Sequence, residues 1–335
     1  MTDSPVGAVV HNDDEVNRTV AERFPSDTTV YRLPTGVMLN SIEFNNAYTV
    51  KVSGYVWQVI PPGLPDNVTH GVVFPEAEDQ MAAAKRATGF TVPYGRVDVF
   101  PFTARIRQQF DYRNYPLDHQ NVWLRMRSAD PSQPVQLVPD FKAIPSHLSK
   151  SDEFVGLTRT IVLGDWTPSY TAFSLFHEAN EYSGNDSGFQ AAELYFNVGI
   201  ERNITGPLIG RIVPVVLLAL LLFLSLFVIT TDPDRRTISG FTAFAIIGFS
   251  VSTVLVVAVN DNAVRAETGS TGIAYIECWY FALYLMTLLI AVNATLLITG
   301  AQRRIVTWHE NLLPKLLFWP LFTGVMCASA LYVLR

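Results

Sequence analysis

The chain has 335 residues, of which 49% are hydrophobic, and its formal net charge at pH 7 is −6. Residues 1–205 hold 16 Lys and Arg against 24 Asp and Glu, a net charge of −8, whereas residues 206–335 hold 8 against 6. The lack of a dense basic patch argues against nucleic-acid binding, and two cysteines in apolar stretches exclude a disulfide framework. We therefore expect an acidic, water-facing domain followed by a membrane domain.

The first 36 residues are polar with some apolar positions, and we interpret them as a lead-in in which residues 13–23 form a short helix. They lack the charged-then-apolar layout of a signal peptide. A domain outside the cytoplasm needs such a leader, so we expect that one, or a further upstream segment, precedes this sequence in its precursor.

Residues 37–205 show the signals of short strands separated by Pro, Gly and Asp turns. Alternating β-branched and aromatic residues predict strands over 48–59, 89–109, 122–127, 158–163 and 194–200. Residues 76–87 are compatible with a helix. With no regular alternation of strands and helices, this pattern predicts an all-β, immunoglobulin-like antiparallel sandwich.

Residues 206–335 contain apolar runs long enough to cross a bilayer as helices, which takes about 20 residues. The four runs are 208–230, 237–259, 273–299 and 312–334. Arginines occur in the first and third connections, which share one side, and the positive-inside bias makes that side cytoplasmic. We therefore expect a four-helix bundle in the inner (plasma) membrane, with residues 1–205 and the connection 260–272 outside.

The second run differs from the others because it carries hydroxyl groups and glycine. On a helix, Ser239, Thr242, Ser250 and Thr253 fall within one sector. Such a stripe suits a helix that lines a wet passage. Alternatively, these hydroxyls bond to carbonyls of their own helix or hold helices together.

Enzymatic function is not indicated by any motif. The six histidines show no metal-binding spacing, and there is no Ser/His/Asp set or Gly-rich phosphate loop. Four spans are few for a transporter. The rival to a channel is a non-conducting sensor, a sandwich anchored by four helices, which we expect to lack a polar span face and to carry a cytoplasmic effector.

Five short motifs follow one another in order and at consistent spacing. They are FDYRNYPLDHQ at 110–120, GDW at 164–166, IER at 200–202 with Pro214 after it, RT at 236–237 with Gly240 and Thr242, and YIECW at 275–279. Together they resemble the pentameric ligand-gated ion channels, the Cys-loop receptor superfamily, over residues 37–335. Position 121 is Asn, so the resemblance is to the cysteine-less bacterial form.

The resemblance implies a homopentamer with a ring of sandwiches over a ring of four-helix bundles, in which five copies of the second span surround one pore. It implies a ligand-gated channel, opened by a small molecule or ion bound in the outer domain. Membrane lipids and permeating ions are the other expected partners. An organic cofactor is not implied.

Two registers of the pore helix are open. The family match places Ile238, Thr242, Ala245, Phe249, Ser252 and Val256 toward the axis. The hydroxyl stripe instead favours Ser239, Thr242, Ile246, Phe249, Thr253 and Val257. A ring of five Phe249 side chains would close the pore by dewetting; the alternative is that Phe249 packs between helices.

Ion selectivity depends on fixed charge at the pore mouths. Asp234 is expected at the cytoplasmic mouth and Asp261 near the outer mouth, and the −8 outer domain adds to the same field. We expect a cation channel. An anion channel is the alternative if Arg235 and Arg236 face the axis. A further alternative is that these charges are simply solvated helix ends.

By the same resemblance, Asp118 at the tip of the 110–120 loop, Arg202 before the first span and the segment Arg265–Glu267 are expected to meet and couple the outer domain to the pore. An ion pair partly removed from water is a plausible mechanical joint, and Pro116 stiffens the loop. The alternative is a surface pair of little energetic weight.

Ligands in this family bind between neighbouring outer domains, under a hairpin that we place at 173–189. The expected residues there are Phe176, His177, Glu181 and Tyr182, with Tyr55, Trp57 and Arg105 facing them. Aromatic rings suit an amine, Arg105 suits a carboxylate, and His177 could sense protons. Alternatively, Tyr55 and Trp57 are sheet core.

A second candidate site in the outer domain is the acidic turn of Glu76, Glu78 and Asp79. Its carboxylates offer oxygen ligands for calcium, so modulation by divalent cations is possible. The alternative is that these side chains are simply solvated.

Overall fold

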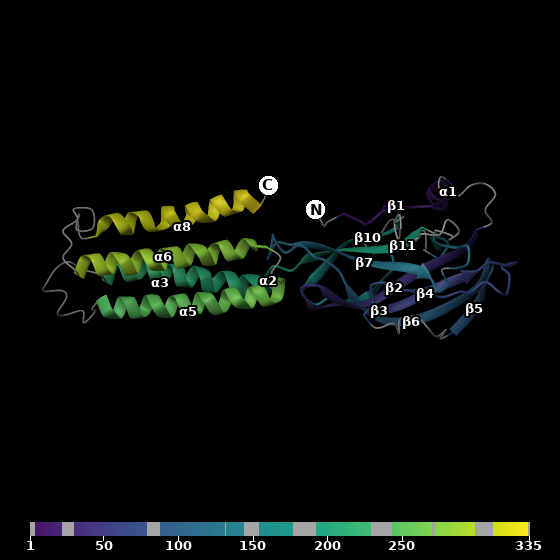
Figure 1. The fold of residues 1–335 in the computed structure, drawn as a ribbon, viewed down its shortest axis with the longest axis horizontal. Helices are drawn as coiled ribbons and strands as arrows, with labels where there is room; N and C mark the ends of the chain where they lie inside the picture. The colour runs from purple at the N-terminus through teal and green to yellow at the C-terminus, as the bar shows by residue number, and fades with distance from the viewer. Residues whose placement is uncertain are drawn as a thin grey trace. The chain divides into compact units, whose positions relative to one another are not determined.

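The computed structural model describes residues 4–21, 30–78, 88–130, 132–143, 154–176, 192–228, 243–269, 272–298 and 311–333. The chain forms two compact units (Figure 1). The β unit comprises residues up to Asp111 together with His119–Arg202, and the helical unit comprises Tyr112–Asp118 together with the residues from Asn203 onward. The expected order, a mostly β domain followed by four apolar helices, is confirmed.

The first sheet of the β unit has five strands in the order β1-β10-β11-β7-β4, and every neighbouring pair is antiparallel. The strands are β1 (Ala8–Val10), β10 (Trp166–Phe176), β11 (Glu193–Arg202), β7 (His119–Ser128) and β4 (Val72–Val73). Strand β10 has no clear sequence signal because Pro168 and a register shift between Pro168 and Tyr170 interrupt its alternation.

The second sheet has six strands in the order β5-β6-β3-β2-β8, and β9 pairs with β2 outside this path. The strands are β5 (Thr88–Val92), β6 (Gly95–Arg107), β3 (Thr49–Ile60), β2 (Tyr31–Asn46), β8 (Val135–Pro139) and β9 (Leu157–Val162). Both β8 and β9 pair with β2 in parallel. The expectation of a purely antiparallel sandwich is therefore wrong at these two pairs, because crossover connections return both strands in the direction of β2.

The core of the β unit follows the two-residue period of its strands. In β3 the side chains of Val50, Val52 and Val56 are at most 1% exposed, and Phe100 and Phe102 of β6 are similarly buried. Burying one such side chain is worth about 1.5–3 kcal/mol. Strand β2 begins at Tyr31, within the segment interpreted from its sequence as a lead-in. This start was not predicted because Pro34 is unusual inside a strand.

The N-terminal helix α1 (Asp13–Ala21) confirms the expected short helix. Its start carries a reciprocal cap. The Glu15 N–H donates to Asn12 Oδ1 at 2.9 Å, and Glu15 Oε2 accepts from the His11 N–H at 2.8 Å. These bonds satisfy amides that have no partner inside the helix. The buried side chains Val16 and Val20 hold α1 in place.

Within the described ranges, four helices of the helical unit are long and apolar enough to cross a membrane. The first comprises α2 (Thr205–Pro207), the π-helical turn η2 (Leu208–Ile212) and α3 (Val213–Val228); the others are α5 (Ala243–Thr268), α6 (Tyr275–Ile298) and α8 (Leu312–Val333). Helices α3 and α6 each contact the other three helices of the bundle. The wide turn precedes Pro214, which lacks the amide of a regular α-turn.

Helix α5 extends to Thr268, nine residues beyond the apolar run that predicts it. Asn260 and Asp261 end the apolar run but are compatible with a helix. The helix stops at Gly269, which adopts a φ of 76° and donates its N–H to Arg265 O at 2.9 Å. A left-handed glycine is a common helix terminator. The last turn of α5 therefore holds Arg265 and Glu267 in fixed positions.

Candidate functional site

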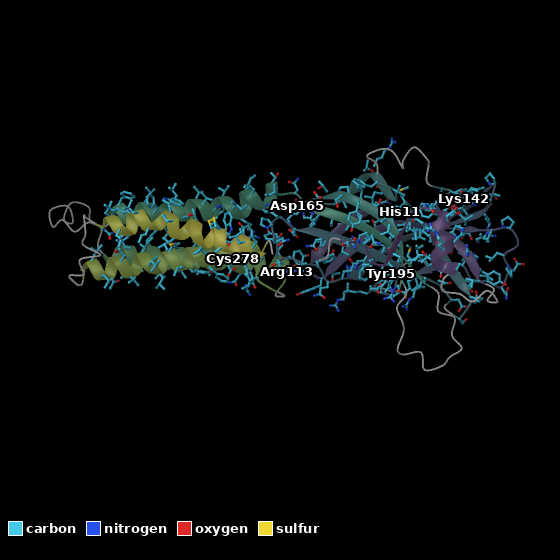
Figure 2. The ribbon with its side chains drawn as sticks, turned by 90° about the horizontal axis from the view of Figure 1, so that it is seen from above. His11, Arg113, Lys142, Asp165, Tyr195 and Cys278 are labelled. Carbon is cyan, nitrogen blue, oxygen red and sulfur yellow. The ribbon has the colours of Figure 1, made fainter. Side chains whose placement is uncertain are left out.

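The loop Tyr112–Asp118 lies between β6 and β7 in the chain but caps the start of α6. The Tyr275 N–H donates to Arg113 O at 2.8 Å, and the Ile276 N–H donates to Tyr115 O at 3.3 Å. The first amides of a helix have no partner within it, and here two loop carbonyls supply partners. Figure 2 shows Arg113 at the end of the bundle where α6 begins. The loop and α6 are thus joined through their backbones.

Glu277 joins the same end of α6 to the last turn of α5. Its Oε2 accepts from the Ala274 N–H at 2.7 Å, which is the side-chain half of a capping box. Its Oε1 lies 2.7 Å from Arg265 Nε in an ion pair. The Glu277 side chain is 1% exposed, whereas that of Arg265 is 43% exposed. One buried carboxylate therefore fixes both helices.

A second contact links the loop to the first long helix and to α5. The hydroxyl of Tyr115, which is 1% exposed, donates to Glu267 Oε2 at 3.3 Å. The same oxygen lies 3.2 Å from Arg211 Nη2 of η2. Tyr115, Arg211 and Glu267 thus bring together three segments that are far apart in the chain.

These contacts form one junction, defined by the loop Tyr112–Asp118 with Arg211, Arg265, Glu267 and Glu277. It holds two cations and two anions on helices of membrane-spanning character. These contacts connect the loop to the start of α6 and, through Glu277 and Glu267, to the last turn of α5.

The predicted coupling residues have different outcomes. Arg265 and Glu267 belong to the junction, and Pro116 and the buried Asp118 lie in its loop. Arg202 belongs to β11, where its guanidinium lies 4.2 Å from the centre of the Trp166 ring. The meeting of Arg202 with Asp118 stays a prediction.

Sequence reasoning did not select four residues of the junction: Arg113, Tyr115, Arg211 and Glu277. Arg113 and Tyr115 act at the α6 cap through backbone carbonyls, which leave no mark in side-chain chemistry. Glu277 lies at the third position of α6, but Ala274 stands where a capping box usually has Ser, Thr, Asp or Asn. The available signals were Arg211 and Glu277, each a charge within an apolar run, and the two motifs that contain Arg113, Tyr115 and Glu277.

The residues of the two expected pore registers differ in their exposure on α5. Ile246 and Thr253 are 3% exposed, and Val257 is 1% exposed, so all three pack inside their own bundle. Ala245, Ser252 and Val256 are exposed, and Phe249 is half-buried. The Ser252 and Thr253 hydroxyls each donate to a carbonyl of α5 at 3.0 Å, as the alternative interpretation expected.

The structure covers the expected pore mouths only in part. Asp234, Ile238 and Thr242 lie outside the described residues. Asp261 lies on the buried side of α5, one turn from Val257 and Val264, and its Oδ1 has no hydrogen-bond partner among the described residues. A helix position next to buried valines does not suit a charge at an open mouth.

The expected ligand residues lie on both sheets. Tyr55, Trp57 and Arg105 occupy the face of the second sheet that points away from the core. Tyr55 is 44% exposed, so the alternative that it is sheet core is wrong. Trp57 is partly buried and its Nε1–H donates to Asp140 Oδ2 at 2.9 Å.

Phe176 lies on the first sheet, at the end of β10. With Tyr195 and Trp123 it forms a group that we call the aromatic trio. The ring centres of Phe176 and Tyr195 are 5.9 Å apart, and those of Trp123 and Tyr195 are 5.5 Å apart. His177, Glu181 and Tyr182 lie outside the described residues.

The acidic turn expected to bind calcium is engaged in ion pairs. Glu76 Oε1 lies 2.8 Å from Arg125 Nη1, and Glu78 Oε1 lies 3.0 Å from Arg107 Nε. Asp79 is outside the described residues. Among the residues that the structure covers, no group of three His, Cys, Asp or Glu side chains is placed to hold a metal ion.

Arg125 is the centre of a largely buried charge network in the first sheet. It contacts Glu76 and Glu193, and Glu193 also contacts Arg127 and accepts from the Tyr195 hydroxyl at 3.4 Å. Burial alone would lower the pKa of Arg125, but the hydrogen bond and charge of Glu193 and the charges of Tyr195 and Glu76 raise it above its ordinary value. Arg125 thus stays charged inside the unit.

Replacing Arg125 by Met is expected to lower the free energy of unfolding by about 2 kcal/mol, because Glu193 loses one of its two arginines while remaining buried. Thermal denaturation followed by circular dichroism measures the change. Arg127→Met, at a more exposed partner of the same carboxylate, is the matched control and should cost less. Equal, small effects of both variants would show that the network contributes little.

A scan of protein-family models finds no match for this chain, and a search of the curated proteins finds none either. Its function must therefore be inferred from the fold and from the residues described above. Two features carry that inference: the junction at the loop end of the bundle, and the exposed face of α5.

Proposed function

We propose that this protein is a homopentameric ligand-gated ion channel of the inner membrane, with α5 as its pore-lining helix. The observation that carries the proposal is the division of α5 into two faces. One face, including Ile246, Thr253 and Val257, packs on the protein's own bundle. The side directly opposite exposes the aliphatic residues Val251, Leu255 and Val259, and a strip between the two sides exposes the small or hydroxyl-bearing residues Ala245, Gly248 and Ser252. Lipid gains nothing from such a strip, whereas a wet passage does.

The aliphatic side of α5 supports an assembly of several copies. Val251 and Leu255 are each 65% exposed, and Val259 is 61% exposed. In an oligomer, neighbouring bundles would cover these aliphatic side chains and leave Ala245 and Ser252 facing the axis. The family resemblance supplies the number five.

The proposal uses the register of Ile238, Thr242, Ala245, Phe249, Ser252 and Val256. Ile246 and Thr253 are left out because a side chain buried in its own bundle cannot also line a passage between bundles. Phe249, the largest side chain of the register in the described part, would form the hydrophobic constriction.

We infer cation selectivity from charge. Asp234 is kept as the charge at the inner mouth, while the buried side of α5 is a poor place for the proposed outer charge at Asp261. The net −8 of residues 1–205 adds an attractive field for cations. An anion channel of the same architecture is the alternative, and reversal potentials in asymmetric KCl separate the two.

Gating would run through the junction. Binding of a small molecule or ion in the β unit is proposed to displace the loop Tyr112–Asp118. The loop carbonyls hold the start of α6, and Glu277 and Glu267 hold the last turn of α5. Movement of that turn would change the width of the constriction at Phe249.

The decisive experiment compares neighbouring cysteine substitutions, Ser252→Cys and Thr253→Cys, in protein reconstituted in liposomes with Cys278 and Cys327 replaced by Ala. A charged, water-soluble thiol reagent should modify the cysteine at 252, because it faces a wet passage, and spare the buried one at 253. Mass spectrometry measures the modification without requiring an agonist.

Leu255→Cys is the control for a position that is exposed in the single chain but is not in contact with water. Leu255 is 65% exposed in the single chain, and we propose that a neighbouring subunit or lipid covers it. It should stay unmodified. If the cysteine at 252 is as unreactive as the one at 255, α5 faces acyl chains. The chain is then a non-conducting sensor with a membrane anchor.

A further inference from the structure

The N-terminal segment Ser4–Val10, which we call the strap, lies against the first sheet of the β unit. Its second half forms β1, in which Ala8, Val9 and Val10 pair with Leu175, Ser174 and Phe173 of β10. Its first half contacts side chains of β11 and β7. The strap, interpreted from its sequence as part of a lead-in, therefore contacts the three neighbouring strands β10, β11 and β7.

The side chains beneath the strap are Asn121 of β7, Ser174 of β10 and Asn197 of β11, which we call the polar ladder. The strand register places them on the same face as Tyr195 and Gly199, opposite the core residues Leu194 and Phe196. This is the outward face of the sheet. Nevertheless Ser174 and Asn197 are 0% exposed and Asn121 is 7% exposed, because the strap covers them.

The polar ladder binds the backbone of the strap rather than its side chains. Asn197 Oδ1 accepts from the Val6 N–H at 2.9 Å, the Ser174 hydroxyl donates to Val6 O, and Asn121 Nδ2 donates to Ser4 O at 3.2 Å. The ladder is ordered internally, since Asn197 Nδ2 donates to Ser174 Oγ at 2.8 Å. Such a row of side chains can hydrogen-bond the backbone of an extended polypeptide, as a neighbouring strand does.

Gly7 lets the strap pass close to β10. Its φ is +80°, and a Cβ placed there would lie 2.8 Å from Leu175 O and 2.9 Å from Phe176 Cβ. Both the backbone angle and the contact distance exclude a larger residue without displacement of the strap. The strap therefore runs directly against Phe176, a member of the aromatic trio.

The chemistry of this contact suits reversible docking. Within the strap only Val10 is buried, and the ladder beneath is polar. Release would break the pairing of β1 with β10, expose Val10, and hydrate the side-chain amides of Asn121 and Asn197 and the Ser174 hydroxyl, but it would not open an apolar groove. The chain entropy regained by the strap would offset part of this loss. If the strap were held in an apolar groove, its release would also expose apolar surface to water and would be less favourable.

We propose that the polar ladder is a docking site for an extended backbone, that the strap is its occupant, and that docking restrains the end of β10 that carries Phe176. Release of the strap frees the aromatic trio and thereby alters gating. The docking step stands on the β unit alone, whereas the effect on gating rests on the proposed channel function.

Gly7→Ala in the full-length protein tests the docking step. Hydrogen exchange of peptides covering 4–10 and 171–176 should accelerate about tenfold, because local opening of β10 becomes easier. The matched control is Gly63→Ala, at a glycine with φ +89° where an added Cβ would have nothing within 4 Å. It carries a similar backbone penalty without touching the strap, and its β10 exchange should match the wild type.

Rescue tests the identity of the occupant. A synthetic peptide of residues 1–12, added to the Gly7→Ala protein, should restore protection of 171–176, and the same peptide with Gly7→Ala should not. Asn121→Ala provides a second variant without backbone strain, and it should accelerate exchange at 4–10 to a smaller extent. Unchanged exchange in both variants, or failure of the wild-type peptide to restore protection, overturns the docking site.

Bilayer recordings test the effect on gating. Gly7→Ala should raise the spontaneous open probability about fivefold at unchanged single-channel conductance, and Gly63→Ala should behave as the wild type. Altered exchange with unaltered gating would support docking and overturn its regulatory role. A protein that never conducts, in any variant, would refute the channel function and the regulatory step together, while the exchange result would still decide the docking site.

Discussion

Replacing Glu277 by Ala is expected to lower the free energy of unfolding of the helical unit by about 3 kcal/mol. The carboxylate is 1% exposed and is held by Arg265 and the Ala274 N–H. Removing one partner of a buried pair leaves a charge and an amide without compensation. We place the loss at the lower end of the range for buried pairs because Arg265, at 43% exposure, can turn to water.

Glu277→Gln separates the two roles of this side chain, since its amide oxygen can still accept from the Ala274 N–H but carries no charge for Arg265. A double-mutant cycle with Arg265→Gln then measures the ion pair alone. Thermal melting in detergent reports stability, and open probability in bilayers reports coupling. A cycle with no interaction energy, together with gating like the wild type, would remove Glu277 from the proposed gating path.

Replacing Phe249 by Ala is expected to raise the basal current about tenfold, which corresponds to about 1.4 kcal/mol in the closed-to-open equilibrium. Five phenyl rings would make a constriction from which water withdraws, and five methyl groups would leave it wide enough to stay wet. Single-channel recording in planar bilayers measures the open probability and separates it from conductance.

Phe281→Ala is the matched control, because Phe281 is 42% exposed on α6 and lies on a helix that the proposal does not place at the pore. It should leave the basal current unchanged. A lower melting temperature of Phe249→Ala with no rise in current would support the alternative in which Phe249 packs between helices. A rise in current in both variants would indicate general loosening of the bundle.

The four long apolar helices were predictable because the requirement for crossing a membrane is one of composition. A bilayer selects for about 20 consecutive apolar residues, and each predicted run overlaps a long helix of the structure. Their ends were less predictable. The apolar run of the second predicted span ends at Val259, but the helix continues to Thr268, because polar residues can end an apolar run without ending a helix.

Strands were predictable where alternation was unbroken, as in β3 and β11. Proline hid two of the strands that were missed. Pro34 lies early in β2, where the partner β8 runs parallel, and Pro168 precedes a register shift in β10. In both cases the missing donor is tolerated because of the geometry of the neighbouring strand.

The amino-acid sequence by itself determined that this protein has an acidic β domain and four apolar helices, because hydropathy and periodicity are local properties. It also marked α5 as the unusual helix. Only the tertiary structure decided which face of α5 is free, since Ser252 and Thr253 are neighbours in the chain but lie on exposed and buried sides. The junction was likewise a tertiary result: the carbonyls of Arg113 and Tyr115 are chemically like any others, and their role arises from where the fold places the start of α6.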